Sequence, residues 1–369
     1  MSDAPRAGKP AMTTPAVIQG RAPRNYGLDI LRIVSICGVV AIHVFGRRVG
    51  AEPKAGRGWW AAVAIDIGFI WVVPVFVMIS GALLLGSRQV VQAPAAFYRK
   101  RAARLVPALI FWNAVYLVGV RIWMRHEHLT TGRVLQLLYD SSVFTQLYFL
   151  WLILGLYAIA PLLASFMVGK GDRRAMATAG LLLAVTVLAF VVPGILGHFG
   201  VSRPIPMNIF TYWLPYVGYF AAGYALRHVR LKGMALAGAA LAMAALIVFT
   251  VWHFGHGGVL PVADMLVSTS YLGAGVAMTA LGVFAVGLSL SEFISVPRRV
   301  GTLLVALSNA SFGVFLVHLV IFEAIRLHVP AVLGAKSFTA IAMAYLVTLA
   351  ASFAVSWLAS KVPLLRRVF

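Results

Sequence analysis

An arginine and a histidine, Arg32 and His43, share the first hydrophobic segment of this 369-residue chain. A charged side chain inside a bilayer is costly unless it is paired or hydrated, so such residues mark candidate functional sites. Eleven helical steps of about 100° bring the two side chains to within roughly 20° of one face, about 16 Å apart along the axis. Ile36 and Val39 fill the stripe between them. The spacing suits a helix that holds a cation-binding group at one depth and a titratable group at another.

Both residues also have structural interpretations. His43 is equally consistent with a histidine that ends a helix at the membrane interface. Asp29 stands three residues before Arg32, and an i,i+3 pair of opposite charges neutralises itself. The shared face favours a functional role for Arg32 and His43 together.

A second candidate is the basic run FYRKRAARLVP, which precedes the third apolar segment. Arg101 and Arg104 are one helical turn apart, and Arg99 lies just before them. Arginine offers planar, bidentate donors that suit phosphate groups. We expect these three arginines to bind a phosphorylated cytosolic ligand. The alternative is an ordinary positively charged flank, which explains Lys100.

The third candidate is the stretch LSNASFGVFLVH, in which Ser311 and His318 are seven residues apart and share a helical face. If this helix runs in the same direction as the first, His318 lies at about the depth of His43. A core histidine bonded to a backbone carbonyl is the equally weighted alternative. Glu323 lies about 140° around the helix from His318, so the two are not expected to pair.

Composition indicates a membrane protein. The chain is 61% hydrophobic and 11% charged, with a mean hydropathy of +0.92. A soluble domain carries about a quarter charged residues. The net charge of +21 first suggests nucleic acid, but the basic residues are scattered between apolar segments and indicate topology signals and contacts with anionic membrane lipids. Cys37 is the single cysteine, which excludes disulfides within the chain and cysteine metal sites, and we expect no metal.

The apolar runs are continuous over about 20 residues, which predicts an all-α polytopic membrane protein with about ten transmembrane helices. Residues 1–25 are polar, basic and rich in Pro and Ala, and we predict a disordered cytoplasmic tail followed by one transmembrane domain, 26–369. The predicted spans are 28–46, 61–85, 103–123, 146–168, 175–199, 207–228, 234–255, 261–289, 300–328 and 335–360.

Lysine and arginine predict the orientation of these spans. With the amino terminus inside, the inner segments carry 20 basic residues and the outer loops 10, and Arg32 is the remaining one of 31. This bias favours cytoplasmic amino and carboxyl termini in the cell (inner, cytoplasmic) membrane. The first outer loop, which holds Arg47, Arg48, Lys54 and Arg57, goes against the rule. Arg32 is then near the cytoplasm and His43 near the outer face.

Several ordered motifs resemble the acyltransferase 3 family of integral membrane enzymes, which O-acylate surface glycans. LDILRIVSICGVVAIHVF resembles its opening helix, in which an arginine and a histidine flank ten residues, here Arg32 and His43. VPVFVMISGALLL, FYRKRAARLVPALIFW, LYFLWLILGLYAIAPLL and LSNASFGVFLVHLVI resemble later helices. The style is closest to the surface-polysaccharide branch, with its enterobacterial common antigen O-acetyltransferases. The chain departs from the pattern at Gln146, where the family often has histidine, and at Phe315, where it often has tyrosine.

The resemblance implies transfer of an acyl group, most simply acetyl from acetyl-CoA, to a hydroxyl of an extracytoplasmic or lipid-linked glycan. The cytoplasmic arginines Arg99, Arg101 and Arg104 would hold the CoA phosphates. His43 would act as general base or carry the acyl group itself, and His318 would assist it. Arg32 would stabilise the developing oxyanion or bind a CoA phosphate.

Two other function classes compete with this hypothesis. A transporter or flippase for a glycan or lipid-linked sugar also has many spans, but such carriers commonly use membrane carboxylates and repeated halves. Here intramembrane acids are few, and no repeat is visible. A degenerate family member acting as a partner in glycan assembly is the third possibility. Turnover of acetyl-CoA by the purified protein separates an enzyme from both.

Overall fold

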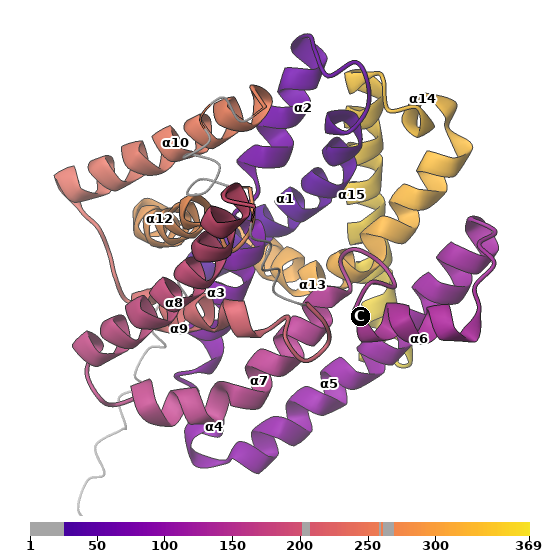
Figure 1. Ribbon diagram of the computed structural model, residues 1–369. Helices are drawn as coiled ribbons and strands as arrows, with labels where there is room; N and C mark the ends of the chain where they lie inside the picture. The colour runs from indigo at the N-terminus through magenta and orange to yellow at the C-terminus, as the bar shows by residue number, and fades with distance from the viewer. Residues whose placement is uncertain (1–25, 201–206, 258–259, 261–268) are drawn as a thin grey trace, which may run out of the picture.

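The computed structural model describes residues 26–200, 207–257, 260 and 269–369, and every regular element in these ranges is helical (Figure 1). The predicted tail, 1–25, lies outside the described residues. The elements in chain order are α1 (Gly27–Val49), α2 (Arg57–Gly68), α3 (Val72–Leu84), α4 (Arg88–Gln92), α5 (Pro94–Ala114), η1 (Val115–Met124), α6 (Thr131–Tyr139), α7 (Tyr148–Met167), α8 (Asp172–His198), η2 (Leu214–Tyr216), α9 (Val217–Leu226), α10 (Gly233–Gly255), α12 (Ala274–Leu290), η3 (Ser291–Phe293), α13 (Arg298–His328), α14 (Pro330–Leu333), α15 (Phe338–Lys361) and η4 (Leu365–Arg367).

Nine helical segments in the described part of the chain are long and apolar enough to cross a membrane, which confirms the all-α polytopic fold. They are Gly27–Val49, Arg57–Leu84, Pro94–Met124, Tyr148–Met167, Asp172–Pro193, Gly233–Gly255, Ala274–Phe293, Arg298–His328 and Phe338–Lys361. Two of these segments are not uniform α-helix. The chain turns between α2 and α3, and α5 continues as the π-helical η1, in which the Arg125 amide donates to the Val120 carbonyl five residues back at 3.0 Å.

The predicted span 207–228 differs from the others, because its only helices are the three-residue η2 and the ten-residue α9. It still leads from one end of the bundle to the other. Near its start, the Ile209 amide donates to the Tyr139 carbonyl at the end of α6, at 3.0 Å. Just beyond its end, Arg230 pairs with Glu292 after α12, at 2.7 Å. An apolar run therefore predicts the crossing but not how much of it is helical.

The two helices that carry the predicted histidines lie side by side and run in the same direction. Arg32 in α1 donates from Nη1 to Ser308 Oγ in α13 at 3.2 Å, and the rings of His43 and His318 are 5.4 Å apart. The residue numbers in these two contacts differ by 276 and 275, as expected for parallel helices in constant register. Ile36 and Val39 are buried along the same stripe. The face predicted from the eleven-residue spacing is confirmed.

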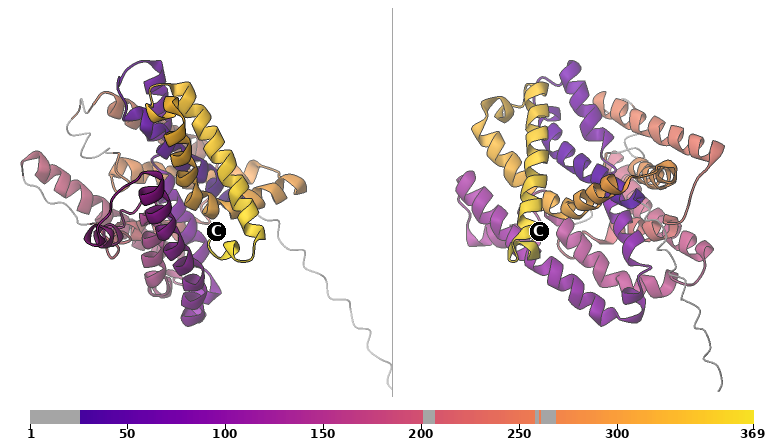
Figure 2. Two further views of the ribbon diagram at one scale, coloured as in Figure 1. Left: turned by 90° about the vertical axis from the view of Figure 1, so that its right-hand side faces the viewer. Right: turned by 180° about the vertical axis from the view of Figure 1, so that it is seen from behind.

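α15 completes this part of the bundle and runs antiparallel to α13. The ring of Tyr345 packs 5.5 Å from Phe45 in α1, and Ser356 near the other end of α15 donates to the Ala310 carbonyl of α13 at 2.9 Å. Tyr26, just before α1, lies against Gly301 in the first turn of α13. The start of α1 and the end of α15 are consequently on the same side of the bundle. In contrast, α10 lies at its edge (Figures 1 and 2), with only 6% of its most apolar window buried.

Two glycines allow α3 and α9 to cross with their backbones in contact. A Cβ on Gly81 would lie 1.8 Å from the Phe220 carbonyl oxygen, and one on Gly223 would lie 1.8 Å from that of Met78. Small residues permit such close approach between membrane helices, where packing rather than the hydrophobic effect drives association. This crossing fixes α3, which supplies one wall of the site described below.

We expect Gly223→Ala to destabilise the protein, because the new methyl group cannot be accommodated without separating α3 from α9. Overpacking of this kind costs about 1–3 kcal/mol or more. The measurement is the thermal unfolding midpoint of the purified protein in detergent. Gly238→Ala in α10 is the matched control, since a Cβ there meets nothing within 4 Å. Equal midpoints for the two variants would contradict this account of the crossing.

Candidate functional site

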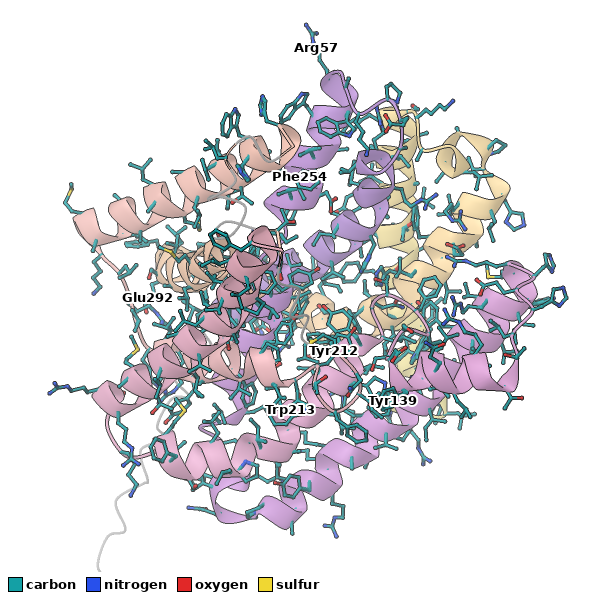
Figure 3. The ribbon with its side chains drawn as sticks, in the orientation of Figure 1. Arg57, Tyr139, Tyr212, Trp213, Phe254 and Glu292 are labelled. Carbon is teal, nitrogen blue, oxygen red and sulfur yellow. The ribbon has the colours of Figure 1, made fainter. Side chains whose placement is uncertain are left out.

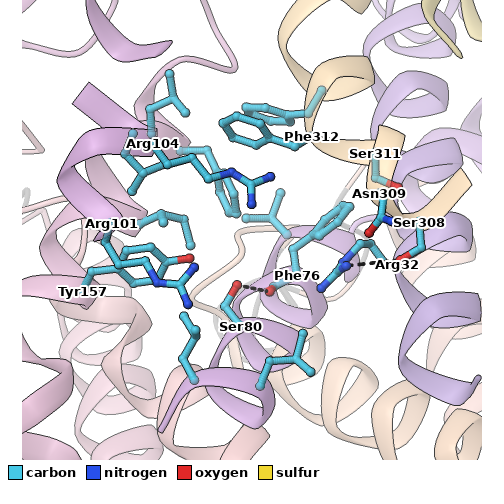
Figure 4. A pocket seen from close by; sticks show the side chains of 18 of the residues that line it. Arg32, Phe76, Ser80, Arg101, Arg104, Tyr157, Ser308, Asn309, Ser311 and Phe312 are labelled. Atoms are coloured by element: carbon cyan, nitrogen blue, oxygen red, sulfur yellow. Dashed lines mark hydrogen bonds between the residues drawn. The ribbon is translucent and has the colours of Figure 1, made fainter. Parts of the chain in front are cut away.

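A cavity of about 390 Å³ lies between α1, α3, α5, α7 and α13 (Figure 4). Its size is typical of small-molecule sites. One part of its lining is polar or cationic and the other is apolar. The polar and cationic members are Arg32, Ser80, Arg101, Arg104, Tyr157, Ser308, Asn309 and Ser311, and the aromatic members besides Tyr157 are Phe76, Phe149, Phe312 and Phe315.

Three arginines from two helices converge on this cavity, Arg32 from α1 and Arg101 and Arg104 from α5 (Figure 4). The Arg101 guanidinium lies over the rings of Phe97 and Tyr157, with its Cζ 5.5 Å and 5.6 Å from their centroids. The Arg104 guanidinium lies 5.5 Å from the Phe312 ring. Contacts with aromatic faces hold a guanidinium in place without neutralising it. The donors thus stay directed into the cavity.

The two α5 arginines, Arg101 and Arg104, bring positive charge to the cavity without a carboxylate partner of their own in the described residues. No Asp or Glu is among its lining residues, and neither Arg101 nor Arg104 forms an ion pair within the described ranges. Arg101 Nε is buried and has no hydrogen-bond partner there. An unpaired buried donor costs free energy, so its presence in a cavity indicates a place for an acceptor group. The arrangement suits a phosphorylated or otherwise anionic ligand.

Arg99 does not join the other two predicted phosphate ligands. It is exposed on α5 and is not among the lining residues of the cavity, although it is only two residues from Arg101. Helix geometry explains the difference, because residues two apart point in directions about 160° from each other, whereas Arg101 and Arg104 share a face. The structure therefore brings together Arg32, Arg101 and Arg104.

Three phenylalanine rings line the apolar part of the cavity. Phe149 of α7 packs against Phe76 of α3 at 6.3 Å between centroids and against Phe315 of α13 at 5.2 Å. Phe315 is also 6.2 Å from the ring of His318. These rings form an apolar wall between the arginines and the histidine pair.

The histidine pair lies one helical turn beyond this wall. Neither His43 nor His318 lines the cavity, but Val39 does and precedes His43 by four residues, and Phe315 does and precedes His318 by three. The ring contact at 5.4 Å confirms that the two histidines are at the same depth. On both α1 and α13, the residues that line the cavity precede the histidine.

Hydrogen bonds assign the protonation of His318. Its Nδ1 is 3.1 Å from the Val314 carbonyl and 2.8 Å from the Phe315 carbonyl, so Nδ1 carries the proton and donates. The carbonyl contact expected for a core histidine is therefore present. Nε2 is nevertheless buried without a partner in the part of the chain described. With Nδ1 bonded to the backbone and its ring 5.4 Å from that of His43, His318 is placed to orient a neighbouring base.

Sequence reasoning missed several residues of the cavity, among them Ser80, Tyr157, Ser308 and Asn309. Ser308 receives the hydrogen bond from Arg32. The sequence signal for Ser308 and Asn309 was present, since two adjacent polar residues interrupt an apolar helix. Tyr157 gave no such signal, because tyrosine is common in membrane helices at positions without function.

The fold and this site define a polytopic membrane protein with a cationic cavity beside a pair of histidines. A family model described as an acyltransferase domain, that of the acyltransferase 3 family, matches residues 25–361. The chain belongs to this family and is a membrane acyltransferase. The assignment covers nearly the whole transmembrane domain, and it gives no support to the transporter alternative.

No curated protein and no solved structure matches the chain in the other two comparisons. The geometry of the site therefore comes from the chain's own residues.

The cavity should be accessible to water, because charged guanidinium groups line it. We expect Asn309→Cys, made in a Cys37→Ser background, to react with a water-soluble maleimide. The control is Leu241→Cys in α10, which is 73% exposed but on an apolar helix at the edge of the bundle. Maleimide reacts with the thiolate, which a lipid-facing cysteine does not form. Labelling is measured as the mass increase of the intact protein, and equal labelling of both cysteines would contradict a hydrated cavity.

Proposed function

We propose that this protein transfers an acetyl group from cytosolic acetyl-CoA to a hydroxyl of an extracytoplasmic or lipid-linked glycan. It would thus be a surface-polysaccharide O-acetyltransferase of the cell membrane. One observation carries the proposal: a cavity lined by three arginines lies one helical turn from paired histidines on α1 and α13, with aromatic rings between them. The arginines suit the phosphates of CoA, and the histidines suit proton transfer from a hydroxyl.

The proposed orientation places the arginine-lined cavity toward the cytoplasm. The start of α1 and the end of α15 are on the same side of the bundle as Arg32, so both termini would be cytoplasmic. The 20-to-10 bias of basic residues favours the same orientation. The donor would enter from the cytoplasm and the acceptor would reach the histidines from the opposite side. Anionic lipids would contact the basic inner loops.

The proposed chemical step is a direct transfer. The acceptor hydroxyl gives its proton to His43 as its oxygen attacks the thioester carbonyl carbon. The carbon–sulfur bond then breaks, and the departing CoA sulfur takes the proton back from the His43 imidazolium. Arg32 lies about 16 Å from His43 along α1 and would bind a CoA phosphate in the cavity. A second route forms an acyl-His43 intermediate, and trapping of labelled acetyl on the protein distinguishes the two.

His318 would act through His43 in this mechanism. Its Nδ1 donates to two backbone carbonyls, and its Nε2 would accept a hydrogen bond from the N–H of His43, which leaves the other His43 nitrogen to act as base. A base oriented by a third group is a general feature of activated nucleophiles. His318 is thus a positioning residue.

We expect His43→Ala to lower acetyl transfer by about 10²- to 10⁴-fold, the usual loss for a general base. The measurement is transfer of radiolabelled acetyl from acetyl-CoA, with the thermal unfolding midpoint as the check on folding. His256→Ala is the matched control, because His256 is exposed just after α10 and does not line the cavity. Near-normal transfer by a folded His43→Ala protein would assign His43 a structural role.

Removal of either of the two α5 arginines that line the cavity should weaken donor binding. A charge-assisted hydrogen bond contributes about 1.5–3 kcal/mol, so Arg101→Ala or Arg104→Ala should raise the KM for acetyl-CoA by about 10- to 100-fold. Lysine should restore binding only partly, because it lacks the guanidinium fork. Arg99→Ala on the same helix is the control, and its KM should stay unchanged. If all three variants behave alike, the arginines serve orientation in the membrane and not donor binding.

A further inference from the structure

A second group of arginines lies at the opposite end of α1 and α13 from the cavity. We call it the outer arginine cluster, and it comprises Arg47 of α1, Arg121 and Arg125 at the end of η1, and Arg326 of α13. Two carboxylates, Glu127 and Glu323, lie among them. Four guanidinium groups against two carboxylates leave an excess of two positive charges.

Glu323 is the fixed centre of this cluster. Its carboxylate is only 4% exposed and accepts from Arg125 Nε at 2.7 Å and from Arg326 Nε at 3.0 Å. The hydrogen bond to Glu323 raises the pKa of the Arg125 guanidinium above its usual value. Arg125 is further held over the Phe144 ring, with its Cζ 5.0 Å from the centroid. Arg125 and Arg326 are therefore held in place before any ligand arrives.

Glu127 balances the remaining η1 arginine. It lies 3.0 Å from Arg121 Nε and 3.6 Å from Arg125 Nη1. The π-helical geometry of η1 brings Arg121 and Arg125 to the same end of the bundle as α13's last turns. These contacts use both carboxylates of the cluster.

Arg47 is the member without a counter-ion. It is exposed at the end of α1 and forms no ion pair or hydrogen bond from its side chain within the residues that the structure describes. It interacts electrostatically with Arg326, Glu323 and Arg125. Arg47 therefore adds a positive charge to a group whose carboxylates are already engaged.

The other basic residues of the same loop have structural partners. Arg48 donates to the carbonyls of Ala51 and Pro53 at 3.0 Å and 3.1 Å, and Lys54 pairs with Glu52 at 3.7 Å. The side chains of Arg48 and Lys54 thus form contacts within the loop that follows α1. Of the four basic residues in this loop, Arg47 is the one that belongs to the outer arginine cluster.

The position of Arg47 relates the cluster to the reaction. Arg47 follows His43 by four residues, which places it one turn and about 6 Å farther along α1. Glu323 follows His318 by five residues on α13. An acceptor that reaches the histidines from this side must pass the cluster, and a negatively charged group on the same or the next sugar would lie beside Arg47.

We propose that the outer arginine cluster binds a carboxylate or phosphate group on the acceptor glycan, with Arg47 as the principal contact and Arg326 as its neighbour. The acceptor is then an anionic saccharide. This inference rests on the proposed function for the identity of the bound saccharide as acceptor. Arginine's planar fork recognises both carboxylate and phosphate in bidentate fashion.

The test compares binding of three small glycosides to the full chain in phosphatidylcholine nanodiscs. The probes are p-nitrophenyl glucuronide, p-nitrophenyl glucoside and glucose 6-phosphate, and their Kd values are measured by thermophoresis. We expect the wild type to bind at least one of the two anionic probes at least about 10-fold more tightly than the neutral glucoside. Comparison of the glucuronide with glucose 6-phosphate then shows whether the cluster prefers a carboxylate or a phosphate. Arg47→Gln should abolish this preference and leave the glucoside Kd unchanged.

Arg57→Gln is the matched control, since it removes the same charge from the same loop and Arg57 points away from the molecule (Figure 3). It should keep the preference for the anionic probe. Equal binding of charged and neutral probes by the wild type, or equal effects of the two substitutions, would overturn the proposal. Retention of added phosphatidylglycerol that depends on Arg47, without sugar selectivity, would also overturn it and assign the cluster to lipid headgroups.

Acetyl-CoA turnover in the same nanodiscs separates this inference from the proposed function. Charge-selective sugar binding without any acetyl transfer would leave the anionic site standing and reject the transferase reaction with these sugars. Acetyl transfer to the glucoside and the anionic probes with equal KM would support the transferase reaction and reject the anionic site.

Discussion

The parallel contact between α1 and α13 is the constraint on which the rest of the site depends. It sets Arg32 beside Ser308 and His43 beside His318 in one constant register. The other elements are arranged around this pair: α3 and α7 close the cavity, α5 adds two arginines to it, and α15 packs across the back. Because both helices carry polar residues at matching depths, each costly group meets a polar partner or a cavity instead of lipid.

The two ends of this helix pair hold cationic groups that differ in kind. In the cavity, Arg101 and Arg104 pack against aromatic rings and no carboxylate is among the lining residues, so their charge is available to a ligand. At the other end, Glu323 and Glu127 occupy part of the guanidinium surface and fix its geometry. Under the proposed function, the first site would release a spent donor and the second would align a glycan, and these tasks place different demands on rigidity that the counter-ions match.

Much of this arrangement could be predicted from the sequence, because helix periodicity is a local property. The shared face of Arg32 and His43 followed from spacing alone, and the common depth of His318 followed once its helix was taken to run in the same direction as the first. The same helical geometry excludes Arg99 from the cavity. The expectation that Arg99, Arg101 and Arg104 bind one ligand did not take into account that residues two apart on a helix point in different directions. Tyr157 could not be predicted as a cavity residue from the sequence. Both the lipid-facing and the buried faces of α7 are apolar, so the helix has no amphipathic pattern that would show which face is buried. The 207–228 segment was predicted as a span, but its short helices were not, because hydropathy reports the polarity of a crossing and not its backbone conformation.

The register between α1 and α13 limits how such a protein can change in evolution. Deleting one residue between Arg32 and His43 would rotate the histidine by about 100° around α1, away from His318, while leaving every side chain type intact. A side-chain substitution in the same stretch alters packing locally, but a change of length alters which groups can meet at all. The number of residues between Arg32 and His43 is therefore constrained, whereas the side chains within this interval are free to change. Variation should collect in the loops, where added residues do not disturb the alignment of the two helices.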